Sequence, residues 1–167
     1  MKVRELEALG RVRIDHVGIA VRSLAEKVPL YRDVLGLELV REEVVPTESV
    51  RVALLGGGET HIELLEPLEG AGPIAEFLAK RGEGVHHLCF GVEDIDAALA
   101  RVRRAGLPVV GEAPRPGAGG CRVAFLRPNS TGGVLVELSE KPPGKPPGKP
   151  PQKRPEEPPE KPPEKPQ

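Results

Sequence analysis

Aromatic residues and long hydrophobic runs are both scarce in this 167-residue sequence. It contains no tryptophan, one tyrosine and three phenylalanines, and its 24 Lys and Arg residues nearly balance 25 Asp and Glu residues. Nucleic-acid-binding proteins usually present a basic surface with aromatic side chains among the charges, so this composition argues against a nucleic-acid partner. No apolar run approaches the roughly 18 residues that a transmembrane helix needs, and the opening MKVRELEALG lacks a signal-peptide core. We therefore expect no membrane association.

Cysteine is also scarce, since the chain has only Cys89 and Cys121. Each stands alone in an apolar, strand-like segment, which matches neither a disulfide framework nor a cysteine metal motif. Structural disulfides are typical of oxidising compartments, whereas isolated thiols are typical of reducing ones. We interpret both residues as reduced core thiols of a soluble cytoplasmic protein.

The C-terminal segment 141–167 differs in composition from the rest of the chain. It holds 12 of the 20 prolines and no hydrophobic residue. Because it has no apolar surface to bury, this segment is expected to be extended and disordered. The sequence thus divides into an N-terminal extension (1–11), one folded domain (12–140) and a tail rich in Pro, Lys and Glu (141–167).

The folded segment contains an internal repeat. DHVGIAVRSLAEKVPLYRDVLGLELV (15–40) and HHLCFGVEDIDAALARVRRAGLPVV (86–110) follow the same order of histidine, strand, helix, glycine and strand. His16 and His87 are 71 positions apart, as are RVALL (from position 51) and RVAFL (from position 122). Self-similarity at a fixed spacing indicates duplicated structural units. We therefore predict an α+β fold of two βαβββ modules (12–68 and 84–140) joined by a short helix (73–82).

Local signals place the helices and turns. Ser23 followed by Glu26 forms a capping box, and Pro29 inside the first helix should kink or shorten it. LGGGET (55–60) joins two strands with no helix after it, which indicates a β-hairpin turn and not a phosphate-binding loop. Gly106 suits the C-terminal cap of the second long helix. The expected buried helix positions are Leu24, Val28, Tyr31, Leu35, Ile95, Leu99 and Val102.

Strand alternation decides which of the two adjacent histidines faces the cleft. Successive strand residues point to opposite faces, so His87 shares its face with Cys89 and Gly91. His16 likewise shares its face with small residues, Gly18 and Ala20. Faces made of small residues leave room for a ligand, and the large apolar faces pack against the helices. We expect His86 to belong to the helix-facing side as a structural residue bonded to backbone.

Each module also places one carboxylate among aliphatic strand residues, at Glu63 and Glu137. A buried lone glutamate is unfavourable unless it is paired or binds a cation. Together with the two cleft-facing histidines, these residues predict a His2Glu2 site for a divalent metal of the zinc, cobalt, nickel, manganese or iron type. His61 shares a face with Glu63 but has no histidine counterpart in the second module. We therefore expect it at the edge of the site.

These residues and motifs resemble the vicinal oxygen chelate superfamily, whose paired βαβββ modules close around a metal. Within it the sequence is similar to the methylmalonyl-CoA epimerase family, through the motifs IDHVGIAV, YRDVLGLEL, IELLEPL, RGEGVHHLCFGVEDIDAAL and STGGVLVEL. The resemblance implies a metal-containing cleft and a homodimer. It implies a divalent cation, with cobalt preferred and zinc, nickel or manganese as alternatives. The metal ligands that it implies are His16, Glu63, His87 and Glu137.

The implied reaction interconverts the (2R) and (2S) epimers of methylmalonyl-CoA by removing the proton next to the thioester through a metal-stabilised enolate. Such a reaction needs one group to remove the proton and another to return it on the opposite face. The resemblance makes Glu137 one of these groups. The family's second acid falls where this chain has Val52, so Glu48 and Glu63 are the candidates to replace it. PRPGAGGCRVAF (114–125) has three glycines that would let a loop approach the substrate closely.

Two other functions share this fold. A lyase of the glyoxalase I type uses a similar set of four ligands and also proceeds through an enediolate. A metal-free binding protein of the drug-sequestering type keeps the fold but lacks the four ligands. The presence of two histidines and two glutamates at matching positions disfavours the binding protein.

Overall fold

The computed structural model describes residues 12–56 and 58–144. The expected N-terminal extension and residues 145–167 of the expected tail lie outside the described residues. The strands are β1 (Arg13–Ala20), β2 (Glu38–Val45), β3 (Val50–Gly56), β4 (His61–Pro67), β5 (Gly84–Val92), β6 (Val109–Pro116), β7 (Arg122–Leu126) and β8 (Leu135–Glu140). The main helices are α1 (Leu24–Pro29), α2 (Gly72–Arg81) and α3 (Ile95–Arg104), and the shorter turns are η2 (Leu30–Val34), η3 (Pro46–Glu48), η4 (Ala118–Gly120) and η5 (Pro128–Ser130).

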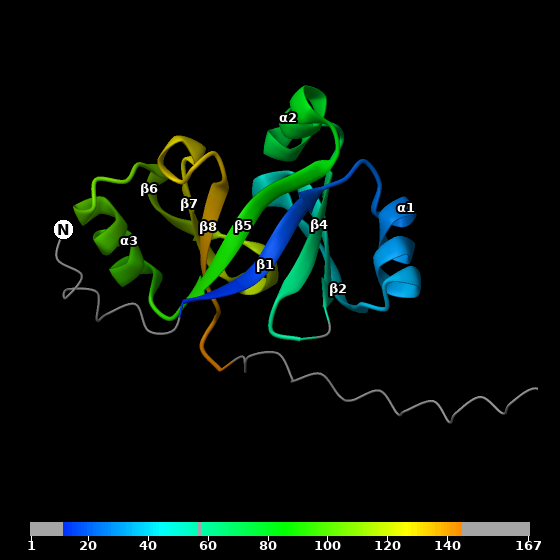
Figure 1. Ribbon diagram of the computed structural model, residues 1–167, viewed down its shortest axis with the longest axis horizontal. Helices are drawn as coiled ribbons and strands as arrows, with labels where there is room; N and C mark the ends of the chain where they lie inside the picture. Colours follow the sequence, from blue (N-terminus) through cyan, green and yellow to red (C-terminus); the bar gives the residue numbers. More distant parts are fainter. Residues whose placement is uncertain (1–11, 57, 145–167) are drawn as a thin grey trace, which may run out of the picture.

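The strands form one mixed sheet in the order β2-β3-β4-β1-β5-β8-β7-β6. Each half repeats the same connections, with β1 parallel to β4 and β5 parallel to β8. The halves meet where β1 pairs antiparallel with β5. In Figure 1 the curved sheet runs between α3 at one end and α1 at the other. The duplicated sequence thus folds as two similar βαβββ units side by side.

The first helix changes geometry at its proline. Ser23 caps its start by accepting a hydrogen bond from the Glu26 N–H (3.4 Å). The regular α-helix ends at Pro29 and continues as the wider π-type turn η2, in which the Leu35 N–H donates to Leu30 O (3.0 Å). Because proline has no N–H to donate and crowds the preceding turn, the regular hydrogen-bond ladder stops there. Gly36 (φ 73°) then reverses the chain, as Gly106 (φ 74°) does after α3.

Three apolar clusters hold the helices to the sheet. Leu24 and Val28 of α1 pack against one face of the first module, while Ile74 and Leu78 of α2 pack against its other face. In the second module Ile95 and Leu99 of α3 are buried with residues of β7 and β8, as the spacing predicts, and Val102 is partly buried against the same cluster. Leu35 differs from expectation, because its side chain lies 57% exposed beyond the end of the α-helix. The core therefore lies under all three helices and leaves the middle of the sheet for the site.

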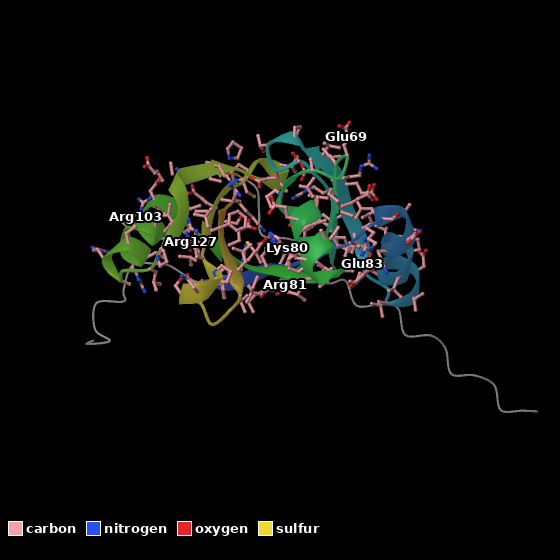
Figure 2. All side chains as sticks on the ribbon, turned by 90° about the horizontal axis from the view of Figure 1, so that it is seen from above. Glu69, Lys80, Arg81, Glu83, Arg103 and Arg127 are labelled. Atoms are coloured by element: carbon pink, nitrogen blue, oxygen red, sulfur yellow. The ribbon has the colours of Figure 1, made fainter. Side chains whose placement is uncertain are left out.

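Many charged side chains lie on the outside of the fold. Figure 2 labels six of them, and all six are exposed: Glu69, Lys80, Arg81, Glu83, Arg103 and Arg127.

The LGGGET segment joins β3 to β4, which pair antiparallel, as the hairpin prediction requires. Among the helices of the described residues, none has the length and apolar character needed to cross a membrane.

Candidate metal centre and active site

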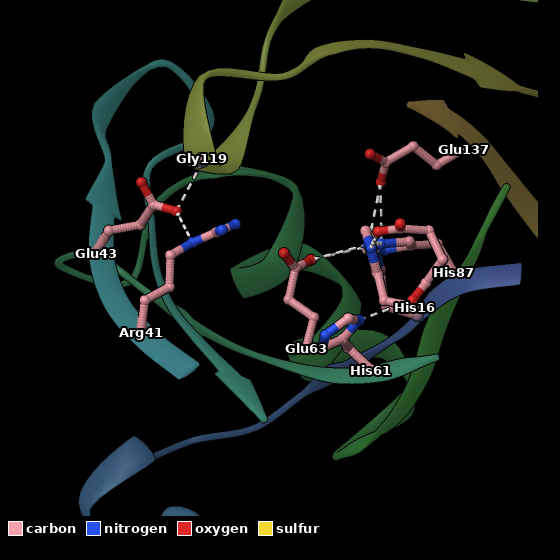
Figure 3. A network of polar contacts seen from close by, with 10 residues as sticks. His16, Arg41, Glu43, His61, Glu63, His87, Gly119 and Glu137 are labelled. Carbon is pink, nitrogen blue, oxygen red and sulfur yellow. Dashed lines mark hydrogen bonds and ion pairs between the residues drawn. The ribbon is translucent and has the colours of Figure 1, made fainter. Parts of the chain in front are cut away.

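Four polar side chains from the two modules come together in the cleft (Figure 3). The Nε2 atoms of His16 and His87 are 3.1 Å apart. Glu63 Oε2 lies 3.3 Å from the first of these atoms and 3.7 Å from the second. Glu137 Oε2 lies 3.8 Å and 3.0 Å from the same two atoms. The structure thus brings together the four residues that the repeat and the strand alternation selected.

The sheet register explains this convergence. Across the parallel pairs, Gly18 lies opposite Glu63, and Cys89 lies opposite Glu137. Across the central antiparallel pair, His16 lies opposite Cys89 and Gly18 lies opposite His87. Each module therefore delivers its histidine and its glutamate at equivalent positions. The two modules are related by an approximate twofold arrangement about the β1–β5 pair.

All four side chains are buried, with relative exposures of 3–6%. Burial would raise the pKa of Glu63, but its contact with His16 prevails and lowers it. Burial would lower the pKa of His16, but hydrogen bonding to Asp15 and the carboxylate of Glu63 raise it instead. Ion pairing between buried acids and imidazoles is one way to offset the desolvation of these groups, and a shared cation is another.

The donor atoms fit a divalent cation. Ligands that each lie about 2.1 Å from one metal ion are separated from each other by about 3.0–3.4 Å. His16, His87 and Glu137 offer three donor atoms within 4.8 Å of one another, and Glu63 contacts both imidazoles. Two imidazole nitrogens with two carboxylate oxygens suit zinc and its neighbours in the first transition row.

Asp15 contacts the His16 ring at Nδ1, the nitrogen that does not face the cluster. Its Oδ2 lies 3.3 Å from His16 Nδ1, and its Oδ1 lies 2.7 Å from Lys141 Nζ. Burial alone would raise the pKa of Asp15, but the contacts with His16 and Lys141 hold it well below its usual value. A carboxylate on Nδ1 fixes the imidazole so that Nε2 faces the cleft, which is how second ligand shells orient metal-binding histidines. Lys141, the first residue of the expected tail, is thereby attached to the domain.

His86 departs in part from its expected place. Its ring packs edge-on against Phe77 of α2 (centroids 5.1 Å apart), and its Nδ1 lies 3.0 Å from His87 Nδ1. Within the part of the chain that the structure describes, the expected hydrogen bond to backbone does not occur. Burial and the neighbouring His87 lower the pKa of His86 to about 4. His86 thus contacts a helix, as expected, but this helix is α2, because the start of β5 lies beside it. Its side chain also lines the cavity described below.

His61 lies beside the four residues and not among them. Its Nδ1 is 3.3 Å from the Asp15 backbone oxygen, and it sits opposite His16 in the β1–β4 register. Neither of the two clusters of potential metal donors found in residues 12–56 and 58–144 includes His61. Glu63 is also outside both clusters, but its Oε2 contacts the Nε2 atoms of His16 and His87. The position of His61 agrees with the expectation that it lies at the edge of the site.

The two cysteines differ in burial, and both are free thiols. Cys89 is fully buried next to His16, and burial raises its pKa to about 12, so it is a protonated core thiol. Cys121 does not belong to the core as expected. It follows the turn η4, is half-buried and lines the cleft.

A cavity of about 370 Å³ surrounds the cluster and extends along the first module. Its walls are mostly aliphatic, and they include Val45, Val50, Val52, Leu54, Leu65 and Ile74. Such a largely apolar cavity with a few converging polar groups is typical of a small-molecule site. Val52 places an aliphatic side chain in this wall, at the position where the family resemblance implies an acid.

Glu48 lies at the end of η3 and lines the same cavity as Glu137. Arg115 of β6 pairs with it through two contacts, Nε to Oε1 (2.7 Å) and Nη2 to Oε2 (3.0 Å). Burial raises the pKa of Glu48; Arg115 opposes this shift and the charge of Glu137 adds to it, so that the pKa lies above its ordinary value. The structure thus offers a carboxyl group in the cavity that holds its proton to a higher pH than a free glutamate.

Sequence reasoning missed three cations that line the cavity: Arg41, Arg115 and Lys141. The glycine-rich segment 114–125 signalled a close-approaching loop, and Arg115 lies within it. No comparable signal marked Arg41, because its orientation depends on an irregularity in strand pairing. Lys141 belongs by composition to the tail, so its contact with Asp15 was not foreseen.

Comparisons with known proteins agree with this architecture. Residues 15–125, more than half of the chain, match the family described as the Glyoxalase/Bleomycin resistance protein/Dioxygenase superfamily. An ethylmalonyl-CoA/methylmalonyl-CoA epimerase from Cereibacter sphaeroides is 43% identical over 130 residues, covering 77% of this chain and 97% of that protein. A probable lactoylglutathione lyase from Synechocystis is more distant, at 30% identity over 128 residues, or 75% of this chain and 95% of that protein.

A solved structure gives the same assignment. A methylmalonyl-CoA epimerase in complex with methylmalonyl-CoA and NH4+ superposes with a TM-score of 0.74 at 41% identity, covering 78% of this chain and 94% of that chain. The predicted fold and the family resemblance are thus confirmed. The chain belongs to the Glyoxalase/Bleomycin resistance protein/Dioxygenase superfamily and, within it, to the methylmalonyl-CoA epimerase family.

Proposed function

We propose that this protein interconverts the (2R) and (2S) epimers of methylmalonyl-CoA. The observation that carries the proposal is the shared cavity, which holds a cluster of four buried metal-type donors and a separate carboxyl group, Glu48, on another element. The family relationship supports the same reaction, since relatives at about two-fifths identity carry that name.

His16, Glu63, His87 and Glu137 are the proposed metal ligands, and the donor distances support this assignment. A divalent cation held there would act as a Lewis acid toward the thioester and carboxylate oxygens of the substrate. Asp15 keeps the His16 ring oriented, and the aliphatic walls exclude water and strengthen each electrostatic contact. Cobalt is our preferred metal, with zinc, nickel or manganese as alternatives.

Glu137 and Glu48 are the proposed acid/base pair. Proton transfer is most efficient when the pKa of the catalytic group lies near the working pH, and burial moves Glu48 in that direction. Its two contacts with Arg115 fix the direction of its carboxyl group. Glu63 is the weaker candidate, because the imidazole of His16 lowers its pKa and favours the ionised, ligating form.

The decisive experiment follows deuterium from heavy water into C2 of methylmalonyl-CoA with the full-length, metal-loaded protein. We expect exchange together with conversion of either epimer into the other. Consumption of the methylglyoxal–glutathione adduct with no exchange at C2 would instead establish the lyase. Absence of bound metal after purification, with no activity on adding cobalt, would favour the metal-free binding protein.

Two further expectations remain proposals. A homodimer rests on the family resemblance, and a molar mass measured by light scattering tests it. A cytoplasmic location rests on the free state of Cys89 and Cys121, and fractionation of the producing cell tests it.

A further inference from the structure

A β-bulge turns the edge strand β2 so that Arg41 lines the cavity and Glu43 lies on the same face of the sheet. Before the bulge, Leu39 pairs with Leu55 and packs with it in the cluster under α1. The register shifts between Leu39 and Arg41, after which Arg41 pairs with Leu54 and Glu43 pairs with Val52. Leu54 and Val52 line the cavity, and directly opposed strand residues share a face. Bulges commonly re-aim side chains next to active sites.

Arg41 differs from the other two cations of the cavity in how it is paired. Arg115 makes two contacts with Glu48, and Lys141 is paired with Asp15. Nε of Arg41 donates a hydrogen bond to Glu43 Oε1 (2.6 Å). For its two Nη groups, no carboxylate or carbonyl partner occurs among residues 12–56 and 58–144. The outer fork of this guanidinium is therefore available to an anion that enters the cavity.

The position of Arg41 is fixed from two sides. Glu43 Oε1 also accepts the Gly119 N–H (2.8 Å), so one carboxylate oxygen joins β2 to the turn η4 of the other module. Gly119 lies against the guanidinium, since a Cβ atom at that position would come within 2.7 Å of both Nη atoms. Figure 3 shows the guanidinium end of Arg41 on the side of the cleft that holds Glu63. The charge of Arg41 acts to lower the pKa of that glutamate, although His16 contributes more.

We propose that Arg41 binds the free carboxylate of the substrate's acyl group, and that Glu43 and Gly119 are positioning residues for it. This inference rests on the proposed function. A guanidinium presents two parallel N–H donors that match a carboxylate, which a lysine cannot do. A thioester of a dicarboxylic acid keeps one free carboxylate, which brings a negative charge toward Glu63 and Glu137. A cation on the cavity wall offsets the repulsion between these carboxylates.

Binding of two non-reacting thioesters to the full-length, metal-loaded protein tests this role by calorimetry. Malonyl-CoA carries the acyl carboxylate and propionyl-CoA does not, while their CoA portions are the same. We expect Arg41→Gln to weaken malonyl-CoA binding roughly 10- to 100-fold, as for loss of a charged hydrogen bond, and to leave propionyl-CoA within about twofold. Equal weakening of both thioesters would place Arg41 on the CoA phosphates and overturn the proposal, as would no change in either.

A second variant tests position separately from charge. Gly119→Ala keeps Arg41 but displaces its guanidinium, so it should reduce the preference for malonyl-CoA in the same direction. Arg32→Gln is the matched control, because Arg32 pairs with Asp33 on the exposed turn η2 and should leave both affinities unchanged. A wild-type protein that binds both thioesters equally would also overturn the role of Arg41, whereas the absence of deuterium exchange at C2 would contradict the proposed function itself. An unchanged preference in Arg41→Gln, in a protein that does exchange deuterium at C2, contradicts only the role of Arg41.

Discussion

Gly18 of β1 lies directly opposite His87 of β5, and the imidazole occupies the space that a side chain at position 18 would fill. A Cβ atom on Gly18 would lie 2.2 Å from His87 Cε1, far inside van der Waals contact. Because Gly18 of the first module has no side chain, there is room beside it for the His87 imidazole of the second module.

Gly18→Ala should therefore displace the His87 ring and weaken cobalt binding by about 10-fold or more, the effect usual for disturbing a metal's supporting shell. Gly91→Ala is the control, because a Cβ atom there meets its nearest neighbours at an ordinary 3.6 Å. Metal titration followed by absorbance, with circular dichroism to check folding, measures both. Equal affinities in the two variants would contradict this account of the site.

Alanine at His16, Glu63, His87 or Glu137 should abolish or severely weaken metal binding and leave a folded domain. His86→Ala and His61→Ala should retain the metal, because these imidazoles contact the ligands or their backbone without joining the cluster. Metal content by mass spectrometry distinguishes the two groups. Loss of metal from His86→Ala, together with retention in His87→Ala, would reverse the assignment of the adjacent histidines.

Glu137→Gln and Glu48→Gln test whether these two residues transfer the proton on opposite faces of the substrate's C2 atom. Each amide keeps the shape of the carboxyl group but cannot accept a proton, so epimerisation should fall by roughly 10²-fold or more. Each variant should still exchange deuterium into one epimer, on the face served by the remaining acid. Each epimer is incubated separately in heavy water, and deuterium content and configuration are followed independently. Near-normal epimerisation by Glu48→Gln would transfer the second role to Glu63.

The raised pKa of Glu48 predicts a specific dependence of stability on pH. Because the folded state binds this proton more tightly, the stabilising contribution is complete below the ordinary glutamate pKa and is lost as pH rises through the raised value. Arg115 and Glu137 face this group and act in opposite directions. Urea unfolding of the wild type and Glu48→Gln, between about pH 4 and pH 7, measures the difference. Wild-type stability should decline relative to the variant as pH rises, and a rise would contradict the shift.

The ion pair between Lys141 and Asp15 predicts which part of the C-terminal segment contributes to stability. Truncation after Gly144 keeps the Lys141–Asp15 ion pair (2.7 Å) and should leave metal affinity and melting temperature unchanged. Truncation after Glu140 removes this partner from a buried carboxylate and should lower the melting temperature by several degrees. Lys141→Ala in the full chain should reproduce the second result. Identical melting curves for all four proteins would show that the ion pair contributes nothing.

Much of the site follows from the sequence, because its four central residues belong to regular strands. Side chains alternate with a period of two, and the repeat supplies each observation twice, at His16 and His87 and again at Glu63 and Glu137. Either histidine alone would have been weak evidence for a metal site. The duplicated pattern could select them because the strands alternate regularly between His16 and Gly18 and between His87 and Cys89, although the sheet is irregular elsewhere.

The remaining features depend on contacts between distant segments. The bulge that turns Arg41 into the cleft arises from pairing between β2 and β3, and nothing in LELVREEVV marks it. His86 packs on α2 because the start of β5 passes beside that helix. Lys141 follows β8 and reaches Asp15 of β1, with β5 between the two strands. The sequence by itself therefore determined the modules and the four buried donors, through strand periodicity. Only the tertiary structure decided which cations line the cavity, because their directions depend on register and on neighbouring elements.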